Sequence, residues 1–177
     1  MTRFRHATRG GRYLRVADPA WRRPLDPVFA AERGGRWNPP GSFLVIYLCA
    51  TRDVARANVL RRFAGLPYGL IDVLPERRPV LIETDVPDRR AVDVVSDAGC
   101  RAAGLPVTYP FDGRGRVVGW GRTQPIGAIA WDQGEASIAA RSAALAKDER
   151  GEELAWLVRT ADDRLRVAVR RRFDDWF

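Results

Sequence analysis

Histidine and cysteine, which commonly hold metals or take part in catalysis, are scarce in this chain of 177 residues. His6 is the only histidine, which argues against His-based metal sites and against Ser–His catalysis. Its place near the N-terminus fits an ordinary strand residue better. The two cysteines, Cys49 and Cys100, lie in apolar or small-residue surroundings, so we expect buried thiols in a reducing compartment. We expect no metal and no disulfide.

Long apolar runs are also missing. The longest one, residues 43–50, is far too short to span a bilayer, and the first residues are not followed by the apolar stretch of a signal peptide. We therefore expect a cytoplasmic protein that makes no membrane contact.

Lysine occurs once, as Lys147, among 30 basic residues in a chain of net charge +8. The arginines are spread along the whole chain and no reader motif is present, so compositional bias explains most of them. One or two can clamp phosphates, and we do not expect a nucleic-acid-binding protein. Four adjacent acidic pairs occur late in the chain, and we interpret them as solvated surface: Asp148-Glu149, Glu152-Glu153, Asp162-Asp163 and Asp174-Asp175.

Length and composition favour one globular domain over residues 1–177. Hydrophobic patterning and capping residues predict an α+β fold, rich in strands and with short helices. The expected strands cover residues 3–7, 43–49, 79–86, 91–95, 136–140, 153–160 and 165–170. The expected helices cover residues 28–32, 52–63, 97–103 and 123–132. The last two strands could be neighbours across a turn at residues 161–163.

The most informative segment is Gly34–Gly41, with the sequence GGRWNPPG, which leads directly into the apolar strand. It places a guanidinium, an indole and an amide in a loop of Gly and Pro, where the backbone can approach a ligand or another segment closely. Binding sites often lie on such loops at the end of a buried strand.

A spaced set of polar residues follows this loop. Arg36 lies in it, Tyr47 near the end of the next strand, Asn58 inside the following helix, and Ser142 after the run of residues 134–140. This set resembles the RES domain family, the toxin halves of bacterial toxin–antitoxin pairs, which is named for an Arg, a Glu and a Ser. GGRWN-x-x-G, the strand ending in Tyr-Leu, the alanine-rich helix and the late Ser-Ala segment match it in order and spacing.

The resemblance implies a fold similar to that of ADP-ribosyltransferases, with a split β-sheet core and NAD held in a cleft. Relatives consume NAD by hydrolysis, phosphorolysis or ADP-ribosyl transfer, which all break the nicotinamide–ribose bond. It also implies a cognate antitoxin as partner, and a ligand site that includes Gly35, Trp37 and Asn38 beside the named set.

The same resemblance gives the set its expected roles. Arg36 would clamp a phosphate or ribose oxygen, Tyr47 would stack on nicotinamide, and Ser142 would hydrogen-bond the ribose or amide. Each has a plain structural alternative: Arg36 could brace the loop, Tyr47 could be a core residue with a satisfied hydroxyl, and Ser142 could be a turn residue.

The chain departs from the family at one position, because the glutamate of the family falls on Asn58. An amide cannot supply negative charge or act as a base. Another carboxylate such as Glu135 or Asp132 could substitute, the protein could turn NAD over slowly, or it could use another substrate. Asn58 could also satisfy a buried contact. A nucleotide-binding or protein-interaction pseudoenzyme is therefore the alternative to an enzyme.

Overall fold

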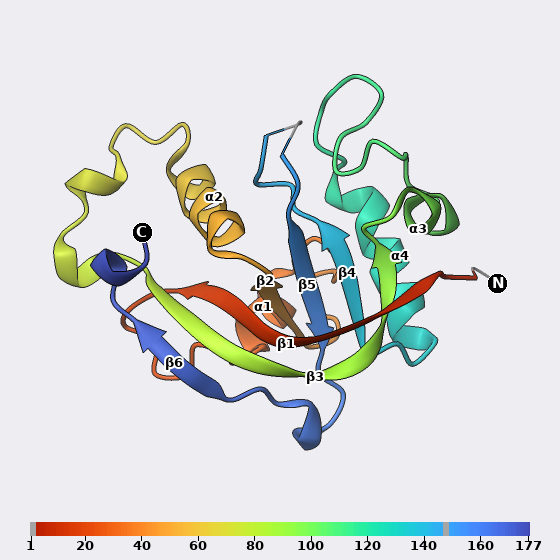
Figure 1. The fold of residues 1–177 in the computed structure, drawn as a ribbon, viewed down its shortest axis with the longest axis horizontal. Helices are drawn as coiled ribbons and strands as arrows, with labels where there is room; N and C mark the ends of the chain where they lie inside the picture. Colours follow the sequence, from red (N-terminus) through yellow and green to blue (C-terminus); the bar gives the residue numbers. More distant parts are fainter. Residues whose placement is uncertain (1–2, 147–148) are drawn as a thin grey trace.

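The computed structural model describes residues 3–146 and 149–177 and is built around one mixed sheet (Figure 1). Six strands follow the order β1-β2-β5-β4-β3-β6. Their bounds are β1 His6–Ala17, β2 Val45–Cys49, β3 Val80–Val94, β4 Ser137–Arg141, β5 Glu152–Leu157 and β6 Val167–Arg171. β3 and β4 run parallel, and the other pairs are antiparallel.

β1 and β3 form a long, curved antiparallel pair that closes the sheet on itself. Their register runs from His6↔Val92 to Ala17↔Val80 and shifts between Arg9 and Gly11. β1 also pairs with β2 through Leu14↔Cys49, so the strands make a ring: β1, β2, β5, β4, β3 and β1 again. β4 and β6 pair with opposite halves of β3, because β3 is long enough to serve both.

The helices are short and cover the sheet from two sides. They are α1 Val28–Arg33, α2 Arg52–Phe63, α3 Asp97–Ala102 and α4 Trp120–Asp132. Short 3₁₀ turns lie between α2 and β3, at Leu70–Asp72 and Pro75–Arg77, and after β5 and β6, at Ala161–Asp163 and Phe173–Asp175. Thr51 and Ser96 cap α2 and α3, as their sequences predict, by accepting hydrogen bonds from backbone N–H groups. α2 lies on one side of β5 and β4, and α3 and α4 lie on the other (Figure 1).

Alternation along the central strands separates two apolar clusters. Ile46, Leu48, Leu154 and Trp156 point into the ring, where they contact residues of β1 and β3. The opposite face carries Val45, Tyr47, Ala155 and Leu157 of β2 and β5 with Ile138 and Ala140 of β4, and it packs against Trp37 and residues of α3 and α4. None of the helices in the described part of the chain has the length and apolar character needed to span a bilayer.

The α+β class and the short helices are confirmed, whereas several element bounds are wrong. The expected strand at residues 3–7 is instead the start of β1, and residues 79–86 and 91–95 belong to the single strand β3. Its polar middle is exposed, which hid its continuity. β5 and β6 are not neighbours, since β5 pairs with β2 and β4 while β6 pairs with β3. α4 begins three residues early, so Pro125 lies inside it.

Candidate functional site

The Gly34–Gly41 loop folds back on itself and is held by backbone hydrogen bonds within the loop and to α1. The Gly35 N–H donates to the Asn38 carbonyl at 2.9 Å, and the Gly41 N–H donates to the Ala31 carbonyl at 2.7 Å. Gly34 and Gly41 have φ of 74° and 70°, a region that side chains rarely adopt, which explains why glycine stands at both ends.

Tyr47 fastens this loop to β2. Its hydroxyl donates to Asn38 Oδ1 at 2.7 Å and accepts from the Trp37 N–H at 2.9 Å. A Cβ atom on Gly35 would lie 2.5 Å from the same hydroxyl, so only glycine permits this approach. The hydroxyl of Tyr47 is therefore satisfied within the protein, and its stacking on nicotinamide stays a prediction.

The side chains of Trp37 and Asn38 anchor the loop in the protein interior. Both are buried, and Asn38 Nδ2 donates to the Ala30 carbonyl at 2.7 Å. The Trp37 ring lies 6.2 Å from the Tyr109 ring, in the core. Of the loop residues that we expected to bind a ligand, Gly35, Trp37 and Asn38 are thus enclosed, and Arg36 alone carries a side chain that is partly exposed.

Arg36 points towards the segment before α4. Its Nη1 donates to the Val118 carbonyl at 3.0 Å, while Thr123 Oγ1 donates to the Arg36 carbonyl. Burial raises the pKa of Tyr47, and raises that of Tyr109 to about 12, and the nearby Arg36 charge acts against both shifts. The guanidinium therefore lies close to two neutral phenols.

A carboxylate that we had interpreted as solvated surface joins Asn58 to Ser142. Glu153 Oε1 accepts from Asn58 Nδ2 at 2.8 Å and from Ser142 Oγ at 2.9 Å. Asn58 Nδ2 also donates to the Val54 carbonyl at 3.1 Å, within its own helix. Two residues of the predicted site, from α2 and from the end of β4, thus meet at one oxygen atom of β5.

Strand register explains this meeting. Glu153 pairs with Cys49 on one side and Ala140 on the other, so it shares the face of Tyr47 and Ala155. The Ser142 N–H bonds the Gly151 carbonyl and continues the β4–β5 ladder by one step. Glu152 points to the opposite face, where Arg9 Nε donates to both of its oxygens at 2.8 and 2.9 Å. The interpretation of the Glu152-Glu153 pair as solvated surface was wrong.

Electrostatics links the two halves of the predicted set. The Glu153 charge contributes to raising the pKa values of Tyr47 and Tyr109, and the Arg36 charge acts in the opposite direction on both. Burial, with a contribution from Glu153, raises the pKa of the Cys49 thiol to about 12, so this cysteine is no nucleophile at neutral pH. Arg36 and Glu153 are left as the charged side chains of the cluster, with Tyr47, Tyr109, Asn58 and Ser142 around them.

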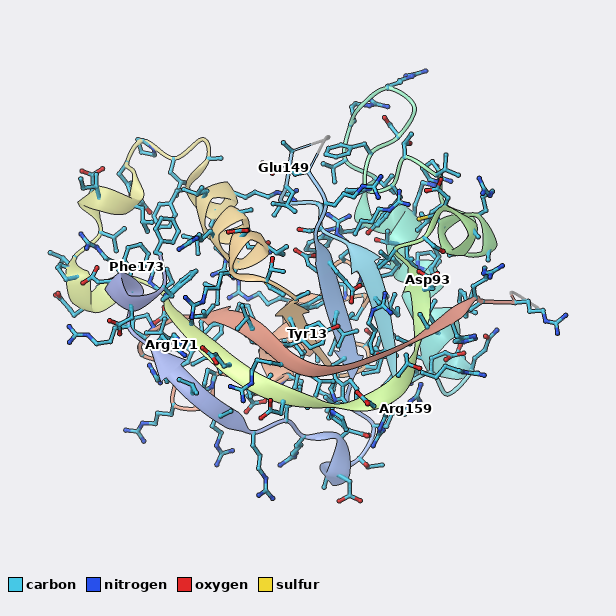
Figure 2. All side chains as sticks on the ribbon, viewed as in Figure 1. Tyr13, Asp93, Glu149, Arg159, Arg171 and Phe173 are labelled. Carbon is cyan, nitrogen blue, oxygen red and sulfur yellow. The ribbon has the colours of Figure 1, made fainter. Side chains whose placement is uncertain are left out.

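A cavity of about 880 Å³, ample for a small-molecule ligand, meets the cluster at Ser142 and Tyr109, whereas Arg36, Tyr47, Asn58 and Glu153 do not line it. Ser142 and Tyr109 belong to its wall, together with charged residues: Arg9, Asp93, Asp97, Arg141, Glu149, Arg150 and Glu152. Figure 2 shows Glu149 at the upper edge of the sheet, in the loop that follows Ser142. Several of these charges are paired, as in the 2.6 Å contact of Arg141 Nη2 with Asp97.

The carboxylates that we had considered as substitutes for the family glutamate lie elsewhere. Glu135 precedes β4 whereas Ser142 follows it, and seven extended residues span roughly 20 Å. Glu135 bonds His6 at 2.8 Å, and its carbonyl accepts from Arg159, which Figure 2 shows at the far edge of the sheet from Glu149. Asp132 ends α4 at the same edge. In the described residues, no group of His, Cys, Asp and Glu side chains could hold a metal ion.

These features define a small mixed α/β protein in which an arginine-bearing loop is hydrogen-bonded to β2, and a buried serine and Asn58 share a carboxylate on the same face of β5. The chain belongs to the RES domain family, whose model matches residues 3–175. Its structure is similar to that of MbcT in the crystal structure of the M. tuberculosis MbcT–MbcA toxin–antitoxin complex. The TM-score is 0.73 at 24% identity, over 93% of this chain and 85% of that one, which shows a shared fold. No match is found among curated proteins.

Proposed function

We propose that this RES domain protein is a cytoplasmic toxin that binds NAD and breaks its nicotinamide–ribose bond. The hydrogen bonds of Ser142 and Asn58 to one carboxylate, on the strand face that also carries Tyr47, support this proposal most directly. An Arg, a Glu and a Ser are the side chains for which the family is named, and here Ser142 lines a cavity of sufficient size while Arg36 lies in the loop that Tyr47 binds.

The chemistry of the bond assigns a task to each charge. Cleavage releases neutral nicotinamide and leaves positive charge on the ribose, while the pyrophosphate remains anionic. The Arg36 guanidinium suits a phosphate or ribose oxygen, because charge-assisted hydrogen bonds from a planar fork are strong and directional. The Ser142 hydroxyl offers a hydrogen bond to the ribose or the amide. Water, phosphate or a protein acceptor then takes the ribose carbon, which gives hydrolysis, phosphorolysis or ADP-ribosyl transfer.

Incubation of the pure protein with NAD tests this function. We expect nicotinamide release, measured by chromatography, together with NAD binding measured by calorimetry. Parallel reactions with and without phosphate, and with candidate protein acceptors, separate the three outcomes. Arg36→Ala should weaken NAD binding, whereas Arg116→Ala, at an exposed position, is the matched control. Neither binding nor release from the wild type would refute the proposal.

Asn58 favours a second candidate, a nucleotide-binding protein without turnover. In this case calorimetry would show tight binding of NAD or a related nucleotide without nicotinamide release, and Asn58→Glu would not change that result.

We also propose an antitoxin as protein partner. MbcT was crystallised with MbcA, and this chain exposes large apolar side chains along one segment: Leu60, Leu66, Tyr68, Ile71 and Leu74, which are 44 to 85% exposed. Apolar side chains gathered in this way are typical of protein-binding surfaces. With a net charge of +8, the chain suits an acidic partner. Co-expression with the neighbouring reading frame, followed by co-purification, tests this pairing.

A further inference from the structure

We infer that Glu153 supplies the acidic group of the reaction, and that Asn58 and Ser142 hold it in position. The inference rests on the proposed function and deepens it. The carboxylate that the family carries at position 58 of α2 is here supplied by Glu153 of β5, to which Asn58 donates a 2.8 Å hydrogen bond.

The hydrogen bonds fix one oxygen of this carboxylate. Asn58 and Ser142 both donate to Oε1, and no hydrogen bond from the described residues reaches Oε2. The side chain is thereby oriented by two donors from separate elements while its second oxygen keeps its acceptor capacity. A carboxylate held in this way can stabilise positive charge that develops on a ribose, or can accept a proton from an attacking water.

The same contact explains why an amide suits position 58. A carboxylate there would face Glu153 at hydrogen-bond distance, and two like charges so close cannot both ionise at ordinary pH. The amide of Asn58 instead donates a hydrogen bond to Glu153. Asn58 is then a positioning residue for the carboxylate of Glu153, which lies one hydrogen bond away from the position of the family glutamate.

Charges around the group agree with this role. Arg36 and Glu153 act in opposite directions on the pKa values of both Tyr47 and Tyr109, so both charges are within electrostatic reach of the same two rings. The anion suits the ribose that becomes positive, and the cation suits the pyrophosphate. Ser142 donates to Glu153 and also lies on the wall of the cavity, so the serine connects the carboxylate to space for a ligand.

Glu153→Gln tests the inference because the amide keeps the size and an acceptor oxygen but removes the charge. We expect nicotinamide release to fall by about a hundred- to a thousandfold, the typical effect of losing one electrostatic stabiliser. NAD binding should stay within a few-fold, and Glu153→Asp should recover part of the rate. Glu32→Gln, an exposed glutamate on α1, is the matched control.

The double variant Asn58→Glu/Glu153→Gln separates catalysis from folding. It returns the carboxylate to α2 with an amide facing it, and we expect it to release nicotinamide at least tenfold faster than Glu153→Gln alone. A Glu153→Gln protein that retains a third or more of the wild-type rate would overturn the inference. So would a loss confined to NAD affinity, or a double variant no faster than the single one. Absence of release from the wild type would instead refute the proposed function itself.

Discussion

Replacing Tyr47 with phenylalanine should destabilise the protein, because its hydroxyl makes two hydrogen bonds to buried groups of the Gly34–Gly41 loop. Tyr47→Phe keeps the ring but removes the acceptor of the Trp37 N–H and the donor to Asn38 Oδ1. Trp37 is 2% exposed and Asn38 is fully buried, so water cannot replace either contact without opening the loop. Each orphaned buried group costs about 1–3 kcal/mol. Partial relaxation reduces the sum, and we expect the free energy of unfolding to fall by about 2–4 kcal/mol.

Urea unfolding, followed by tryptophan fluorescence, measures this change. The midpoint should fall with an unchanged slope, since the surface exposed on unfolding is nearly the same. Tyr68→Phe is the control: that tyrosine is 50% exposed, and its substitution should leave the midpoint in place. One ordinary hydrogen bond is worth about 1 kcal/mol. A smaller loss of unfolding free energy for Tyr47→Phe would refute the conclusion that this hydroxyl satisfies two buried groups of the loop.

Two further predictions concern packing and charge. Gly127→Ala should lower the free energy of unfolding by about 1–3 kcal/mol, because its Cβ would overlap the Trp37 carbonyl and force α4 off the loop. Gly121→Ala, in the same helix with open space around it, should be neutral or slightly stabilising in the same urea titration. Hydrogen bonds from Thr160, Arg159 and Arg89 outweigh burial and hold the pKa of Asp163 below its ordinary value. The ionised Asp163 therefore stabilises the folded protein above about pH 4, and this stabilisation is lost as the pH falls through the folded-state pKa. The thermal unfolding midpoint of Asp163→Asn should consequently depend less on pH than that of the wild type between about pH 5 and 2. An unchanged pH profile would contradict this.

Much of the fold could be read from local patterns. The α2 helix starts at its predicted cap, Thr51, and the apolar run after the GGRWN loop is strand β2, because both signals lie within a few neighbouring residues. β3 was divided in the prediction because the polar residues in its middle are exposed where the strand bends, and exposure there depends on distant partners. The pairing of β5 with β2 and β4, rather than with β6, is a long-range choice that no local pattern encodes.

The site shows the same division. Arg36, Tyr47, Asn58 and Ser142 could be selected by spacing, but their contacts could not. Glu153 was missed because an adjacent acidic pair is typical of solvated surface. A usable signal was present: in a buried strand, residues 153, 155 and 157 share one face, so one glutamate of the pair must point towards the core side. That the face in question also holds Ser142 follows only from the register of β4 against β5.

The central place of β5 has a consequence for the order in which the protein is made. This strand lies between β2 and β4, yet it follows β2, β3 and β4 in the chain, and it carries Glu153. A nascent polypeptide that has not yet reached residue 157 has unpaired edges on β2 and β4 and lacks the carboxylate that we infer to act. We therefore expect the proposed activity to require translation through β5, and a product that stops before it to be inactive.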